Sequence, residues 1–194
     1  MAAAVVVALV ALAGCAGQST IYNSMISTGY RPYLYGYGAG RRDLTTVVLG
    51  NPFDLDQKQM EGRLLAKFNA RPTLLQPTHF TTTPDSSARP EFKAILLFNR
   101  AIVLPDQVCR APDKVPAAEL GSTMRLTATF CYYAGYLSTV TGQLENVTDI
   151  DDPRLDTLIG QMVPLLFPPI DPTRQDDGGM RFLITGGPAL SIGG

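Results

Sequence analysis

The sequence is poor in the residue types that most enzymes and metal sites use. It has one histidine, His79, and three cysteines among 194 residues. A zinc site takes four thiolate, imidazole or carboxylate ligands, and soft or imidazole ligands are scarce here. A Ser-His-Asp triad would have to use His79, and no Gly-x-Ser-x-Gly turn is present to expose a nucleophilic serine. These absences favour a non-catalytic protein with no metal or cofactor.

The sequence also lacks an excess of charge of either sign. Sixteen Lys and Arg residues stand against seventeen Asp and Glu residues, which gives a formal net charge of −1. Nucleic-acid binding calls for a basic face, and attachment to anionic lipid calls for a polybasic patch. The composition therefore argues against both kinds of partner.

No apolar run is long enough to cross a bilayer. Residues 1–12 are almost entirely Ala, Val and Leu, whereas a spanning helix needs about 20 residues. A short apolar run followed by small residues is typical of a secretory signal, although no Lys or Arg precedes this one. A buried strand or helix is the alternative interpretation.

The end of this run, Leu12-Ala13-Gly14-Cys15, resembles a bacterial lipobox. In that motif the cysteine thiol takes a diacylglycerol and the chain is cut just before it. Residues 1–14 would then be a signal peptide, and Cys15 would be the lipidated first residue, firmly anchored because each buried CH₂ contributes about 0.8 kcal/mol. Ala16 follows rather than Asp. By resemblance to sorting in enteric bacteria, we expect the inner leaflet of the outer membrane, with the domain facing the periplasm.

Lipidation of Cys15 leaves an even pair of cysteines, Cys109 and Cys131, in an oxidising compartment. We predict that they form a disulfide, which would close a loop of about 20 residues and add about 3 kcal/mol of stability. Because geometry cannot be read from sequence, two buried reduced thiols are the alternative.

Residues 15–42 show no apolar periodicity and predict a flexible tether between the lipid and a folded domain. The segment interleaves glycines with five tyrosines, namely Tyr22, Tyr30, Tyr33, Tyr35 and Tyr37. The alternative is that these amphipathic rings lie on a partner protein or at the membrane interface.

Residues 43–169 carry the patterns of a folded domain. Strands are expected at 44–49, 92–98, 125–133 and 136–143, with a shorter one at 79–83. Helical spacing of apolar residues follows Asp54 or Asp56, either of which can cap a helix. The same spacing follows Asp152, which we predict to be a helix cap, with Pro153 at the first helical position. This order predicts a single two-layer α+β domain, with a mixed, mainly antiparallel sheet of about 4–5 strands and two amphipathic helices on one face. Cys131 would lie on the other face and hold the proline-rich excursion 105–116 against it.

The C-terminal residues 170–194 are rich in Gly, Pro and Asp. They predict a tail outside the domain, in which 181–185 is a candidate edge strand.

Several short motifs resemble those of a family of alphaproteobacterial envelope lipoproteins with no assigned activity. They are the lipobox, Gly40-Arg41-Arg42-Asp43-Leu44, Val47-Val48-Leu49-Gly50-Asn51-Pro52-Phe53, Phe130-Cys131 and Leu165-Leu166-Phe167-Pro168-Pro169. The resemblance implies an envelope location and transfers no catalytic residues.

We therefore expect a non-catalytic, lipid-anchored envelope protein that acts by binding a partner protein or in envelope assembly. The alternative is a binder of a small apolar or envelope-derived ligand, which would need an apolar pocket of several hundred Å³. A hydrolase is a third possibility. It would rest on His79 with Asp85, Ser86 and Ser87, in a polar loop that fits a solvated turn better than a triad.

Overall fold

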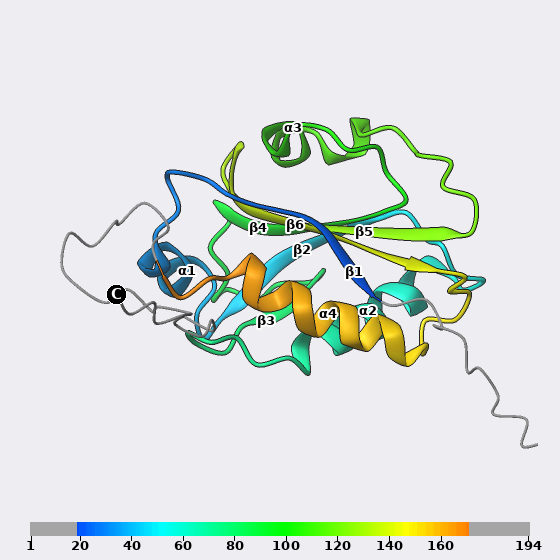
Figure 1. Cartoon of the computed structure of the whole chain (residues 1–194). Helices are drawn as coiled ribbons and strands as arrows, with labels where there is room; N and C mark the ends of the chain where they lie inside the picture. The colour runs from blue at the N-terminus through cyan, green and yellow to red at the C-terminus, as the bar shows by residue number, and fades with distance from the viewer. Residues whose placement is uncertain (1–18, 171–194) are drawn as a thin grey trace, which may run out of the picture.

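Six strands form one mixed sheet in the computed structural model, which describes residues 19–170 (Figure 1). In order across the sheet they are β1 (Thr20–Ile26), β6 (Gly135–Glu145), β5 (Thr123–Tyr132), β4 (Phe92–Phe98), β2 (Asp43–Leu49) and β3 (His79–Thr81). The pairs β1–β6, β6–β5 and β5–β4 are antiparallel. Strand β2 is parallel to both β4 and β3. The α+β class and the mixed sheet are confirmed. The expected strand number of 4–5 is wrong, because β1 adds a strand beside β6.

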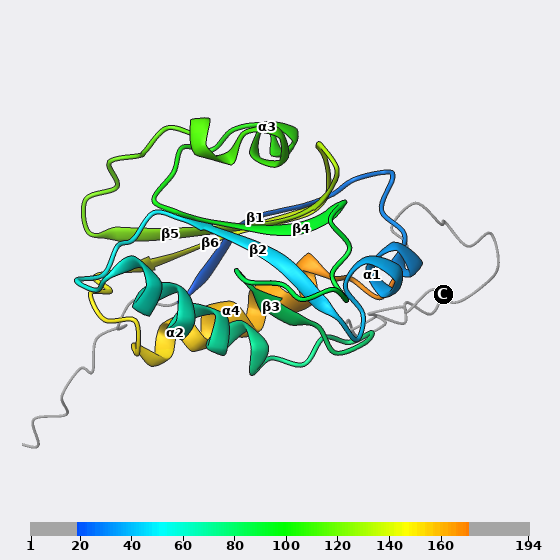
Figure 2. The same ribbon diagram turned by 180° about the vertical axis from the view of Figure 1, so that it is seen from behind.

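Two helices, α2 (Gln57–Asn69) and α4 (Pro153–Leu166), cover one face of the sheet, as Figure 2 shows. Their buried residues recur at three and four positions, so each helix presents one apolar stripe to the strands. Lys67 on α2 and Asp156 on α4 form an ion pair at 2.9 Å that joins the two helices. The main core therefore lies between this helix pair and the inner side chains of the strands.

Helix α4 approaches the sheet closely at Gly142 of β6. A Cβ atom at this position would lie 2.4 Å from Leu158 Cδ1, which is closer than real carbon contacts allow. The glycine therefore lets the backbone of β6 pack directly under the helix.

The opposite face of the sheet is also partly covered, which makes the strict two-layer prediction too simple. Helix α3 (Pro105–Arg110) and a 3₁₀ turn, η1 (Pro112–Lys114), lie across it (Figure 1). Val108 and Val115 pack there against Ile95 and Leu97 of β4. The physical reason is that β4 is continuously apolar from Ala94 to Phe98, so this part of the strand needs cover on both faces.

The prediction of a tether over residues 15–42 is wrong for the part that the structure describes. Strand β1 is followed by a short helix, α1 (Pro32–Gly38), and both belong to the domain. Tyr30 and Tyr35 are fully buried, with the Tyr35 ring 4.7 Å from that of Phe167. The Tyr30 hydroxyl donates to the Pro168 carbonyl at 2.8 Å. The folded domain therefore includes β1 and does not begin at Asp43.

The other three tyrosines of this segment, Tyr22, Tyr33 and Tyr37, are exposed. The segment's aromatics thus divide between core and surface.

Residues 15–18 and 171–194 lie outside the described residues. They include the candidate strand at 181–185 and nearly all of the predicted C-terminal tail.

Asp152 caps α4 as the sequence predicted. Its carboxylate accepts hydrogen bonds from the Arg154 backbone N–H at 2.8 Å and from Arg154 Nε at 3.0 Å. These bonds from Arg154 hold the pKa of the Asp152 carboxyl below its ordinary value of 3.8. A charged cap also interacts favourably with the helix dipole.

We expect Asp152→Ala to lower the free energy of unfolding by about 1 kcal/mol at neutral pH, because one cap is lost. The folded-state pKa is depressed, so this contribution is complete above the ordinary carboxyl pKa and is lost as the pH falls through the lower folded value. Urea titrations between pH 7 and pH 2 should therefore show wild type and variant converging below about pH 4. Asp152→Asn keeps a capping oxygen without the charge, and a pH dependence in that variant equal to wild type would contradict the assignment.

Candidate binding groove beside the β1 edge

A groove of about 550 Å³ lies between the sheet's second face and the segment that leads into α3. Ile102, Leu104 and Pro105 form its wall, and threonines of β5 and β6 form its floor. None of the residues that line it is charged. The groove therefore offers an apolar wall over a weakly polar floor, which suits an uncharged ligand.

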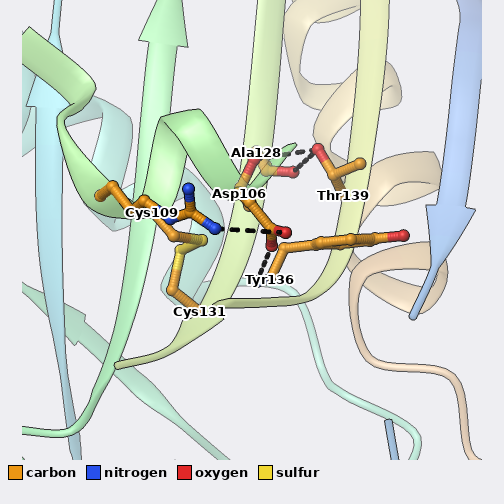
Figure 3. Close-up of a disulfide and its surroundings, with 8 residues drawn as sticks. Asp106, Cys109, Ala128, Cys131, Tyr136 and Thr139 are labelled. Carbon is orange, nitrogen blue, oxygen red and sulfur yellow. Dashed lines mark hydrogen bonds and ion pairs between the residues drawn. A yellow bond between two sulfur atoms is a disulfide. The ribbon is translucent and has the colours of Figure 1, made fainter. Parts of the chain in front are cut away.

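The floor is built from threonines that face each other across β5 and β6. The Thr127 and Thr141 hydroxyls lie 3.0 Å apart, and those of Thr129 and Thr139 lie 2.9 Å apart. The Thr139 hydroxyl can also donate to the Ala128 carbonyl at 3.2 Å (Figure 3). Because these hydroxyls have partners within the sheet, the floor does not require a hydrogen-bonding ligand.

The wall of the groove is fixed to the sheet at α3. The predicted disulfide between Cys109 and Cys131 is present in the structure and joins α3 to β5 (Figure 3). Beside it, Asp106 Oδ1 accepts a hydrogen bond at 3.0 Å from the Tyr136 backbone N–H of β6. The covalent bond and the hydrogen bond hold the short helix, which is too short to be stable on its own. Cys131 lies on the second face, as the alternation of β5 predicted.

The open side of the groove is bordered by β1, an edge strand. Within residues 19–170, β6 is the one strand that pairs with it. The sequence of β1 contains no charged residue and no proline, and one irregularity between Ile21 and Asn23 interrupts its pairing. Natural edge strands usually carry charges, prolines or bulges that prevent further pairing, and of these β1 has only the one irregularity. The edge of β1 is therefore poorly protected.

Large apolar side chains on this side of the molecule are exposed. Leu104 is 69% exposed, Ile102 51% and Met25 40%, and all three line the groove. Scattered exposed apolar residues need no explanation, but a group around one groove is typical of a binding surface. Sequence reasoning missed this site, because its parts come from segments far apart in the chain.

His79 does not build a triad with the serines near it. Its Nδ1 lies 2.7 Å from Asp43 Oδ1, while Ser87 Oγ accepts a hydrogen bond from the Asp43 backbone N–H at 3.0 Å. His79 and Ser87 thus both bond to Asp43, whereas a triad needs a serine hydroxyl on the histidine ring.

The same cluster anchors a loop. Asp43 Oδ2 accepts from the Asp85 backbone N–H at 2.9 Å, and hydrogen bonds from Ser87 hold the pKa of the Asp85 carboxyl below its ordinary value. The cluster ties the polar loop to the start of β2. The sequence placed His79, Asp85 and Ser87 near one another but gave no sign of Asp43.

The neighbouring carboxylates Asp151 and Asp152 both have structural partners. Asp151 pairs with Arg63, and Asp152 caps α4. Over residues 19–170, no group of three or more His, Cys, Asp or Glu side chains is placed to hold a metal ion. No helix in that range has the length and apolarity that a bilayer crossing requires. Cys15 is not among the described residues.

Comparisons with known proteins do not identify a family for this chain. No family model and no curated protein matches the chain. One solved structure that resembles it is a PelC dodecamer from Paraburkholderia phytofirmans, with 7% sequence identity over 78% of this chain and 96% of that chain. The TM-score is 0.34, which is too low to support an inference about the fold or the function of this protein.

Proposed function

We propose that this protein is a non-catalytic, lipid-anchored envelope protein that binds a partner protein at the groove beside β1. The observation that carries the proposal is an uncharged groove of about 550 Å³ whose open side is a poorly protected edge strand. The lipid anchor rests on the lipobox-like sequence that ends at Cys15. An outer-membrane location facing the periplasm follows from the same motif, and it agrees with the resemblance to envelope lipoproteins.

The position of β1 in the chain supports a site close to the membrane. Cys15 precedes Thr20, the first residue of β1, by five positions. Five residues span at most about 18 Å whatever their conformation, because an extended chain covers 3.3–3.6 Å per residue. A protein lipidated at Cys15 would therefore hold the start of β1 near the membrane surface, where a partner in the same membrane can reach it.

A small apolar ligand in the same groove is the second candidate function. The groove volume of about 550 Å³ lies within the range of small-molecule sites. Native mass spectrometry of protein purified from its host distinguishes this candidate, because a bound lipid or other apolar molecule would add a discrete mass.

Photo-crosslinking in native membranes tests the partner proposal. A photoreactive amino acid at Ile102 should give one adduct of defined mass and near-stoichiometric yield, whereas the same group at Leu74 should not. Leu104→Lys should lower the adduct yield at least tenfold, because it places a charge on the apolar wall. Leu74→Lys is a matched control, since Leu74 is 67% exposed and Leu104 is 69% exposed.

The anchor has its own readout in the same strains. Cys15→Ser should remove the acyl mass and shift the protein out of the membrane fraction. Absence of an adduct at Ile102, or equal adduct yields at Ile102 and Leu74, would reject the groove as a partner site.

A further inference from the structure

We infer that the partner contributes an extended, uncharged peptide segment that pairs with β1 as a seventh strand of the sheet. This inference rests on the proposed function and specifies the chemistry of the partner. It follows from three features of the groove: its open backbone edge, the direction of the β1 side chains, and the absence of charge from its lining.

The backbone of β1 favours an extended occupant. On one side, β1 pairs with β6 in antiparallel register from Thr20 opposite Gln143 to Ile26 opposite Ser138. On its other side no described strand follows. A strand has peptide groups on both of its edges, so an added segment can form main-chain hydrogen bonds along the outer one. A compact ligand would leave most of these groups without a protein partner.

The side-chain alternation of β1 directs half of an added strand into the groove. Asn23 and Met25 line the groove and stand opposite Thr141 and Thr139 of its floor. A neighbouring strand shares this pleat, so its alternate side chains fall beside Met25 and face the wall at Leu104. The residues between them face the helix side of the sheet.

The lining of the groove decides the chemistry of those side chains. It contains threonines, asparagine, glutamine and apolar residues but no Lys, Arg, Asp, Glu or His. An ionised side chain entering this groove would lose water without gaining an opposite charge, which is strongly unfavourable. The groove is therefore complementary in charge to a neutral segment with apolar residues at alternate positions.

The opposite edge of the sheet does not offer the same surface. Strand β3 has only three residues and lies between Pro77 and Pro84. Prolines beside a short strand limit how far pairing can extend. Strand addition is therefore assigned to the β1 edge.

Selection from a phage-displayed library of random seven-residue peptides tests the inference on the full-length protein in detergent. We expect enriched peptides to be uncharged, with apolar residues at every second position. A synthetic copy of the best peptide should slow amide hydrogen exchange in β1 at least tenfold. Leu104→Lys and Met25→Lys should weaken its binding at least tenfold, whereas Leu74→Lys should not.

A matched peptide separates strand pairing from simple apolar contact. N-methylation at alternate residues removes main-chain donors but keeps every side chain, so one of the two N-methyl phases should abolish binding. Failure to enrich such peptides, equal binding by both N-methylated forms, or unchanged exchange in β1 would overturn the inference. If Ile102 still captured a partner in membranes, the proposed function would stand and only strand addition would be rejected.

Discussion

A chain that begins at Asp43 is expected not to fold. This truncation removes β1 and α1, and with them the fully buried Tyr30 and Tyr35. It also uncovers β6, which otherwise pairs with β1 from Ser138 to Gln143. If residues 15–42 were the tether that the sequence predicted, the same truncation would leave the domain intact.

The size of the effect follows from the surroundings of Tyr35. Its ring packs 4.7 Å from that of Phe167 and 6.4 Å from that of Phe130, and its hydroxyl donates to Thr73 at 2.8 Å. Truncating a fully buried aromatic residue to alanine costs about 3–5 kcal/mol. Domains of this size have a free energy of unfolding of only about 5–15 kcal/mol. The free energy lost with Tyr30, Tyr35 and β1 together therefore equals or nearly equals this total.

Point variants give the same test without deleting the segment. Tyr35→Ala should lower the free energy of unfolding in urea by about 3–5 kcal/mol. Tyr33→Ala, two positions away on the same helix, should change it by less than about 0.5 kcal/mol, because Tyr33 is 71% exposed. Cooperative unfolding of the chain from Asp43 at the urea midpoint of the full chain would contradict the placement of this segment in the core.

Strong periodicity and clear end signals explain which elements were predictable. Strand β4 is continuously apolar from Ala94 to Phe98, and β5 alternates between two faces. Helix α4 combines the Asp152 cap with Pro153 at its first position and an apolar stripe behind them. Local sequence and tertiary packing agree in these elements, so a single pattern is enough to identify each one.

The N-terminal elements were missed because their sequences carry no such agreement. In β1, Thr-Ile-Tyr-Asn-Ser-Met-Ile, the polar and apolar residues do not alternate. In α1 the glycines and tyrosines are poor helix formers, so packing of Tyr35 against the core decides the conformation. Helix α3 has six residues, which is too short to show a helical period.

The candidate site had one indirect sign in the sequence. The groove lies between residues of β1, β5, β6 and the segment before α3, and no local pattern reveals that such distant segments meet. The cysteine pair was informative because a disulfide between Cys109 and Cys131 requires the proline-rich excursion to lie on the second face. It therefore predicted that the excursion 105–116 lies on this face, although not the groove beside it.

Replacing both Cys109 and Cys131 with alanine is expected to lower the free energy of unfolding by about 3 kcal/mol. The two residues are 22 positions apart, and a bond that closes a loop of this length restricts the unfolded chain. Both cysteines are buried, so the substitutions also remove packed sulfur atoms and add a small cavity cost. Urea unfolding of the oxidised wild type and of the double variant measures the sum of the two effects.

Reduction of the wild type separates the two effects, because it breaks the bond and keeps both sulfur atoms. In the presence of a reductant, the free energy of unfolding of the wild type should fall by nearly the full amount of about 3 kcal/mol. That of the double variant should not change. An unchanged free energy of unfolding in reductant would mean that the thiols are not bonded.

In the folded double variant, Asp106 still bonds to Tyr136 of β6, but α3 loses its link to β5. We therefore expect faster amide exchange in α3, unchanged exchange in β4, and a lower adduct yield at Ile102, because the wall of the groove is no longer held in place.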